Sequence, residues 1–143
     1  MDKERVLLVD DEEEFTQALA ERLENRGLRV RSVASGAAAI EAVKEIYYDA
    51  VILDMAMPDM DGTETLKELL KVNPDIQVIF LAGHATLEKG IEAVKLGAMD
   101  FLEKPVKFDP LLKKISQAKA NKAILVQKRA EEKMKNIIGK KGW

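Results

Sequence analysis

The chain has 143 residues, a length typical of a single domain, and 47% of them are hydrophobic and 34% charged. It contains no cysteine, which excludes disulfide bonds and thiolate zinc sites. No apolar run approaches the roughly 18 residues of a membrane span, and the opening MDKER lacks the apolar stretch of a signal peptide, so we expect a cytoplasmic protein. The net charge of −2 conceals a basic tail, because residues 103–143 hold twelve Lys and Arg against four Asp and Glu.

Five short runs rich in apolar residues predict β-strands. They lie at residues 5–9, 28–33, 49–53, 77–81 and 98–102. Three of these runs are almost continuously apolar, as expected for strands that are covered on both faces. Because helical patterns separate the strands, the sequence predicts an α/β protein with a five-stranded parallel sheet and helices on both faces.

Apolar residues at helical spacing predict one helix after each of the first four strands. The stripes are Phe15, Leu19 and Leu23; Ala38, Ala42 and Ile46; Leu66, Leu69 and Leu70; and Leu87, Ile91 and Val94. Gly27 and Gly97 are expected to end the first and fourth helices. Asp61 and Glu64 are spaced as in a capping box at the start of the third.

The last helix is predicted to begin near Asp109 and Pro110 and to continue to about residue 138. We therefore expect a domain at residues 1–120 and a basic extension of the C-terminal helix, with a loose end, at residues 121–143. The extension has three interpretations: a solvated helix face, a helix that pairs with another copy or a partner, or a lysine-rich contact with nucleic acid or membrane. It lacks room for a helix-turn-helix, which argues against sequence-specific DNA binding.

Charged residues gather where the predicted strands end. Asp10 and Asp11 follow the first strand, Asp54 follows the third, and Lys104 follows the fifth. In open α/β sheets the functional site lies outside the carboxyl ends of the strands, so these four side chains are expected to share a pocket. Carboxylate oxygens suit Mg²⁺, which would offset their mutual repulsion.

These residues stand in three motifs, LLVDDE at 7–12, VILDMAMPDMDG at 51–62 and FLEKP at 101–105. Their order and spacing resemble the receiver domain of two-component response regulators over roughly residues 4–120. The resemblance implies a flavodoxin-like receiver fold with strand order 2-1-3-4-5. It also implies a sensor histidine kinase or phosphotransfer protein as phosphodonor and a downstream protein target. A homodimer through the helix 4–strand 5–helix 5 face or the C-terminal helix would fit the family.

The same resemblance implies a role for each residue of the predicted pocket. Asp54 would be the phosphate acceptor, and Asp11, Asp54 and the main-chain carbonyl of Ala56 would ligate Mg²⁺, with Asp10 acting through a metal-bound water. Lys104 would pair with Asp54 and then with the phosphoryl oxygens, and its bond to the following proline is expected to be cis. The chain would catalyse only its own phosphorylation and dephosphorylation.

The chain departs from the family pattern at Ala82, where receivers carry Ser or Thr. We expect that phosphorylation remains and that switching is weakened, by about ten- to a hundred-fold for the loss of one charged hydrogen bond. Phe101 takes the position of the switch aromatic. Ala56 and His84 take the two positions that tune the lifetime of the phosphate, although an exposed loop residue is the favoured interpretation of His84. Thr86, the nearest hydroxyl, is interpreted as a helix cap.

Two other classes of function are alternatives to the phosphorylated receiver. Ala82 motivates a protein-binding module that keeps the receiver fold and works without phosphorylation. A phosphohydrolase with Asp54 as nucleophile ranks last, because it needs a second acid two residues later and Ala56 stands there. Metal-dependent labelling of Asp54 distinguishes the phosphorylated receiver from the binding module.

Overall fold

A computed structural model of the chain describes residues 3–55, 57 and 62–140. The strands are β1 Arg5–Val9, β2 Arg29–Val33, β3 Ala50–Asp54, β4 Val78–Ala82 and β5 Asp100–Glu103. All five lie within two residues of the predicted bounds. They pair in parallel to form one sheet in the order β2-β1-β3-β4-β5, which confirms the predicted strand order.

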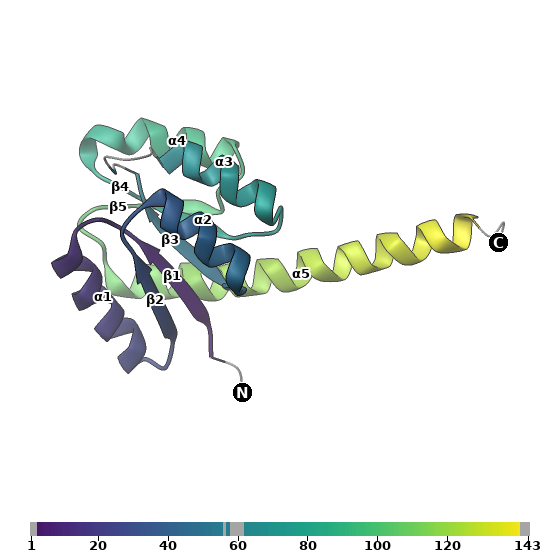
Figure 1. Ribbon diagram of the computed structural model, residues 1–143, viewed down its shortest axis with the longest axis horizontal. Helices are drawn as coiled ribbons and strands as arrows, with labels where there is room; N and C mark the ends of the chain where they lie inside the picture. Colours follow the sequence, from purple (N-terminus) through teal and green to yellow (C-terminus); the bar gives the residue numbers. More distant parts are fainter. Residues whose placement is uncertain (1–2, 56, 58–61, 141–143) are drawn as a thin grey trace.

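Helices cover both faces of the sheet (Figure 1). They are α1 Glu13–Asn25, α2 Gly36–Glu45, α3 Gly62–Val72, α4 Leu87–Lys95 and α5 Phe108–Lys140, with a 3₁₀ turn η1 His84–Thr86 before α4. Leu23 of α1 and Ile115 of α5 pack in one core cluster, whereas Ala42 of α2, Leu66 of α3 and Ala93 of α4 pack in the other. The chain is thus a doubly wound, flavodoxin-like fold with two cores separated by the sheet.

The ends of the helices follow the predicted signals in most cases. Gly27 and Gly97 adopt φ angles of 93° and 122°, which other residues rarely accept, and they lie just past α1 and α4. The predicted cap Asp61 lies outside the described residues. The prediction for Ile46 was wrong, because α2 ends at Glu45 and Ile46 has extended backbone and is exposed. The buried face of α2 is instead built from small residues, including Ala39.

The prediction of which α4 residues face the core was also wrong. Ile91 is 47% exposed and Val94 is 37% exposed, while Gly90 and Ala93 are the buried residues of this helix. A side chain at Gly90 would bring its Cβ to 3.2 Å from Cγ of Phe101, which is closer than most such contacts. Because residue 90 lacks a side chain, α4 lies close against β5 and presents its larger apolar residues outward.

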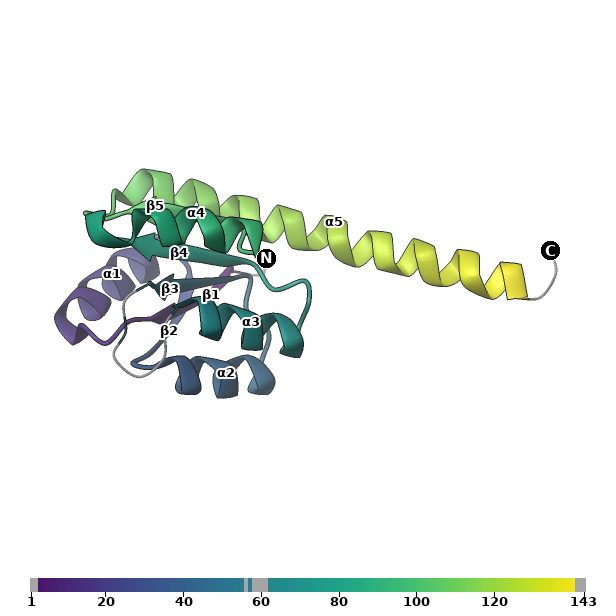
Figure 2. The ribbon, with the colours of Figure 1, turned by 90° about the horizontal axis from the view of Figure 1, so that it is seen from above.

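Helix α5 begins in the domain and continues far beyond it. Leu111, Ile115 and Ala118 are buried against the sheet, whereas Met134 and Ile137 are exposed. Both views show the second half of α5 projecting past all other elements (Figure 1 and Figure 2). Over the part of the chain that the structure describes, no helix combines the length and apolar character needed to cross a bilayer.

Candidate functional site

Three carboxylates meet at the carboxyl edge of the sheet. Asp10 follows β1 and Asp54 ends β3, and the two residues are only 5% and 3% exposed. Asp11 is exposed beside them, and each of the three can place a carboxylate oxygen within 4.8 Å of the others. Because β1 and β3 are neighbours in the sheet, residues 44 positions apart in sequence come together here. The prediction that these three carboxylates lie close together is confirmed.

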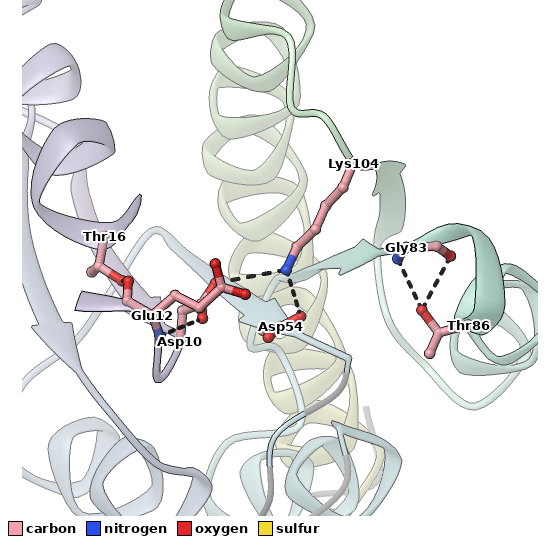
Figure 3. A network of polar contacts seen from close by, with 7 residues as sticks. All are labelled: Asp10, Glu12, Thr16, Asp54, Gly83, Thr86 and Lys104. Carbon is pink, nitrogen blue, oxygen red and sulfur yellow. Dashed lines mark hydrogen bonds and ion pairs between the residues drawn. The ribbon is translucent and has the colours of Figure 1, made fainter. Parts of the chain in front are cut away.

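Lys104 supplies a positive charge to this cluster from the loop after β5. Its Nζ lies 3.1 Å from Oδ1 of Asp54 and 4.0 Å from Oδ2 of Asp10 (Figure 3). The backbone N–H of Lys104 donates to the carbonyl oxygen of Ala82 at 2.8 Å, which ties the loop to the end of β4. The Lys104-Pro105 peptide bond is cis, as expected.

Burial and charge shift the pKa values of two groups in this cluster. Burial raises the pKa of Asp10, and the negative charge of Asp54 raises it further. The backbone hydrogen bond from Glu12 and the positive charge of Lys104 lower it, but the net shift is upward. Burial by itself would lower the pKa of Lys104, but the hydrogen bond to Asp54 and the surrounding carboxylates raise it overall. Lys104 is therefore a permanent cation at neutral pH, while ionised Asp10 carries an electrostatic cost.

The donor set fits a hard divalent cation such as Mg²⁺. Oδ1 of Asp10 accepts a hydrogen bond from the backbone N–H of Glu12 at 2.9 Å. Oδ2 is buried and has no hydrogen-bond partner among the described residues, an arrangement that a cation or its bound water would complete. Ala56, whose carbonyl was predicted to be a further ligand, lies outside the described residues. Asp10, Asp11 and Asp54 are thus the described residues that could hold the ion.

Replacing Asp10 with asparagine is expected to stabilise the metal-free protein at pH 7 by about 0.5–2 kcal/mol. Asparagine keeps an oxygen for the N–H of Glu12 and removes the buried charge. At pH values below the usual carboxyl pKa, Asp10 is protonated in both the folded and the unfolded state, so its burial carries no charge penalty for folding. As pH rises through its raised folded-state pKa, ionisation costs folding free energy, so the advantage of the variant should grow with pH in urea unfolding curves.

Excess Mg²⁺ provides the second half of this measurement. The native chain should gain stability from bound ion, by about 2.7 kcal/mol at a hundred times the dissociation constant, and Asp10→Asn should gain much less. Glu13→Gln, in the first turn of α1 and outside the cluster, serves as the control and should show neither effect. An equal Mg²⁺ response in Asp10→Asn and the native chain would contradict this assignment.

The residues at the predicted switch positions lie in the neighbouring strands β4 and β5. Ala82 ends β4 and is fully buried, and Phe101 of β5 is half-buried against Gly90 of α4. His84 is exposed in the turn η1. The hydroxyl of Thr86 accepts from the N–H of Gly83 at 2.9 Å and donates to its carbonyl at 3.2 Å (Figure 3). It therefore caps η1 and bonds no N–H of α4.

Two contacts at the site were not predicted from the sequence. The ring of Phe15, interpreted only as part of the apolar stripe of α1, has its centroid 5.7 Å from Nζ of Lys104. Gly90 packs against Phe101, and this contact sets how closely α4 approaches β5. No spacing pattern signals either contact, because each joins residues that are far apart in the sequence or lack a side chain.

The fold and the site together define the class of protein. It has a parallel, doubly wound sheet whose carboxyl edge carries a lysine and a group of carboxylates that could bind a cation. The receiver-domain family model, described as response regulator receiver domain, matches residues 6–116. The transcriptional regulatory protein ZraR of Klebsiella oxytoca is 39% identical over 116 residues, which are 81% of this chain and 26% of that protein. The C4-dicarboxylate transport transcriptional regulatory protein DctD of Rhizobium meliloti is 30% identical over 125 residues, 87% of this chain and 27% of the relative.

Solved structures agree with the sequence relatives. The crystal structure of a response regulator receiver domain protein from Clostridium thermocellum superimposes with a TM-score of 0.82 at 35% identity, over 85% of this chain and 98% of that one. The chain belongs to the response regulator receiver family of two-component systems. It spans about a quarter of the length of ZraR and DctD, the curated relatives named above.

Proposed function

We propose that Asp54 accepts a phosphoryl group from the phosphohistidine of a sensor histidine kinase or phosphotransfer protein, in a reaction that requires Mg²⁺. The observation that carries this proposal is the position of the Asp54 carboxylate, which is buried, 3.1 Å from Lys104, and grouped with Asp10 and Asp11. A buried carboxylate can attack a phosphoryl group only where positive charge offsets the negative charge of the phosphoryl oxygens.

Each residue has a distinct part in the proposed transfer. An oxygen of Asp54 forms the new bond to phosphorus while the bond between phosphorus and the donor nitrogen breaks. Lys104 pairs with the phosphoryl oxygens as charge develops on them. Asp11, Asp54 and the main-chain carbonyl of Ala56 would hold the ion, with Asp10 acting through a metal-bound water. When bound, Mg²⁺ would neutralise phosphoryl charge and orient the group for in-line attack. The ring of Phe15 lies 5.7 Å from Nζ of Lys104 and gives this cation a weak aromatic contact.

Intact-mass analysis with a small acyl-phosphate donor tests the proposal directly. The native chain should gain one phosphoryl group with Mg²⁺ and none without it, and Asp54→Asn should gain none because its amide is not a nucleophile. Asp109→Asn, an exposed change in the first turn of α5, is the matched control and should label normally. Labelling that persists in Asp54→Asn would contradict the proposal. If the adduct is hydrolysed before the mass is read, binding of beryllofluoride, a stable analogue of the phosphoryl group, tests the same site in the native chain and in Asp54→Asn.

Ala82 supports the further proposal that switching after phosphorylation is weak. No hydroxyl at residue 82 can donate to the phosphoryl group, and the hydroxyl of Thr86 is already bonded to Gly83. Gly90 also leaves α4 packed directly on Phe101. His84 and Ala56 keep their proposed influence on the lifetime of the phosphate.

Ala82→Thr is therefore expected to strengthen the response to a beryllofluoride analogue. A new hydrogen bond to a charged group should shift the two-state equilibrium by about ten- to a hundred-fold. The measurement is the change in amide NMR shifts of α4 between free and analogue-bound protein. Ala82→Val fills the same space without a hydroxyl, and it should leave the response as weak as in the native chain. A full α4 shift in the native chain would contradict the proposal.

The output of the domain follows from its exposed surfaces. In the proposal, residues 1–120 are the receiver and residues 121–143 are a basic extension, acting in the cytoplasm. The signal passes to a downstream protein, or to a second copy in a homodimer, through the α4–β5–α5 face or the extension. The exposed Ile91 and Val94 on α4 support the first surface, and Met134 and Ile137 on α5 support the second. A binding module that works without phosphorylation is the second candidate, favoured by Ala82 alone.

A further inference from the structure

A second concave site lies at the amino ends of the strands, opposite the carboxylate pocket. A hollow of about 460 Å³ is lined by Lys3, Arg5, Arg29, Tyr47, Asp49 and Lys119. Arg5 and Arg29 are the first residues of β1 and β2, whereas Asp10 and Asp54 leave the other ends of their strands. Strands of this length place the two sites about 15 Å apart. The hollow is therefore independent of the chemistry proposed for Asp54.

Positive charge dominates this hollow. Arg5 and Arg29 are register partners on adjacent parallel strands, so their side chains leave the sheet on the same face. Within the described parts of the chain, neither guanidinium forms an ion pair. Lys119 lies 3.9 Å from Glu4 and is partly offset. Two unpaired guanidinium groups held side by side repel each other unless an anion joins them.

Among the described residues of the lining, Asp49 is the one carboxylate, and it is already engaged. Oδ2 of Asp49 accepts from the backbone N–H of Arg5 at 2.7 Å, and Oδ1 accepts from the hydroxyl of Tyr47 at 2.8 Å. Asp49 therefore shapes the wall by fixing the start of β1 and the ring of Tyr47. Its oxygens are directed to these two groups, which leaves the guanidinium groups to a ligand.

A buried ammonium stands behind the aromatic wall. Lys122 of α5 is 7% exposed, its Nζ has no hydrogen-bond partner among the described residues, and it lies 3.0 Å from the centroid of the Tyr47 ring. Burial lowers the pKa of Lys122 to about 8, so the side chain keeps most of its charge at pH 7. A buried cation whose one partner in the described part of the chain is an aromatic ring is costly. An anion bound on the far side of Tyr47 would offset that cost.

We propose that this hollow binds a small organic or inorganic polyphosphate, with the guanidinium groups of Arg5 and Arg29 gripping adjacent phosphates. Planar guanidinium forks match phosphate oxygens in a bidentate way, and a polyphosphate carries enough charge to satisfy both. The volume falls within the range of small-ligand sites. Tyr47 closes the wall and Lys122 adds positive potential behind it. Nothing in this site depends on Asp54 or on Mg²⁺.

Titration with inorganic tripolyphosphate tests the proposal, using the full chain without added Mg²⁺ at about 0.15 M salt, where diffuse attraction is screened. We expect saturable binding to one site in calorimetry, with amide NMR shifts at Arg5, Arg29 and Tyr47. Orthophosphate should bind at least about tenfold more weakly, because it offers less charge and fewer oxygens to the two guanidinium groups than tripolyphosphate does. An absence of saturable binding, or shifts confined to the carboxyl edge, would overturn the proposal.

Charge variants separate the hollow from a diffuse basic surface. Arg29→Gln removes an exposed side chain from the edge strand β2 and should weaken tripolyphosphate binding about tenfold or more. Lys133→Gln removes the same charge from the projecting part of α5 and should change it less than about twofold. Equal weakening by both variants would overturn the proposal. Lys122→Met should weaken binding while leaving the Tm unchanged or higher, a combination that loss of fold cannot produce.

Discussion

Replacing Lys104 with methionine is expected to slow phosphoryl transfer to Asp54 from a small donor by about a hundred- to a thousand-fold. This is the usual cost of removing one preorganised group that stabilises charge in a transition state. The structural reason is the 3.1 Å contact between Nζ of Lys104 and Oδ1 of Asp54, beside the carboxylates of Asp10 and Asp11. Methionine is an unbranched side chain one atom shorter than lysine, and it removes the ammonium group with its charge and hydrogen-bond donors. The measurement is the initial rate of phosphoprotein formation by intact mass.

Lys107→Met is the matched control for this prediction. Lys107 is an exposed lysine three residues further along the same loop, and it forms no ion pair within residues 3–55, 57 and 62–140. Its variant should be phosphorylated at the native rate. Equal rates for Lys104→Met and the native chain would show that Lys104 is a structural partner of Asp54 and takes no part in the transfer. Circular dichroism of both variants confirms that the fold is retained.

Leu66→Ala is expected to lower the free energy of unfolding by about 2–5 kcal/mol, the usual cost of emptying a filled site in a core. Leu66 of α3 is fully buried in the core cluster that packs on β3 and β4. The surrounding side chains can collapse only partly into the space, so the loss of contacts adds to the loss of apolar burial. Urea denaturation followed by circular dichroism gives the value.

Ile91→Ala provides the contrast, because Ile91 occupies the same kind of apolar stripe in the sequence. Its side chain is 47% exposed on α4, so truncation should cost less than about 1 kcal/mol. Similar losses for both variants would mean that α4 is packed with Ile91 inward, contrary to the structure. The pair therefore tests which face of α4 is buried as well as how tightly α3 is packed.

Much of the fold follows from local pattern in the sequence. Runs such as VLLV and VIFL are continuously apolar because strands covered on both faces bury every side chain. Gly27 and Gly97 end helices because they accept backbone angles that other residues rarely adopt. Asp10, Asp54 and Lys104 could be placed together because the carboxyl ends of parallel strands share one edge.

The face of α4 could not be predicted in this way. Apolar periodicity assigns the largest side chains to the core, but here Gly90 and Ala93 are the buried residues, and Gly90 packs against Phe101. Small residues allow the backbone of a helix to lie close to the sheet. The periodicity of large apolar residues does not reveal this kind of packing. The end of α2 before Ile46 is a second example, because the chain must turn there to enter β3.

The sequence by itself determined the strand count, the parallel sheet, the long final helix and the acidic edge, because each depends on periodicity or on where a strand ends. The tertiary structure alone decided which face of α4 is buried, that the hydroxyl of Thr86 bonds to Gly83, and that Lys122 lies behind Tyr47. It also brought Arg5, Arg29 and Lys119 around one hollow. These features join residues from separate elements, and their distances are fixed only when the helices pack against the sheet.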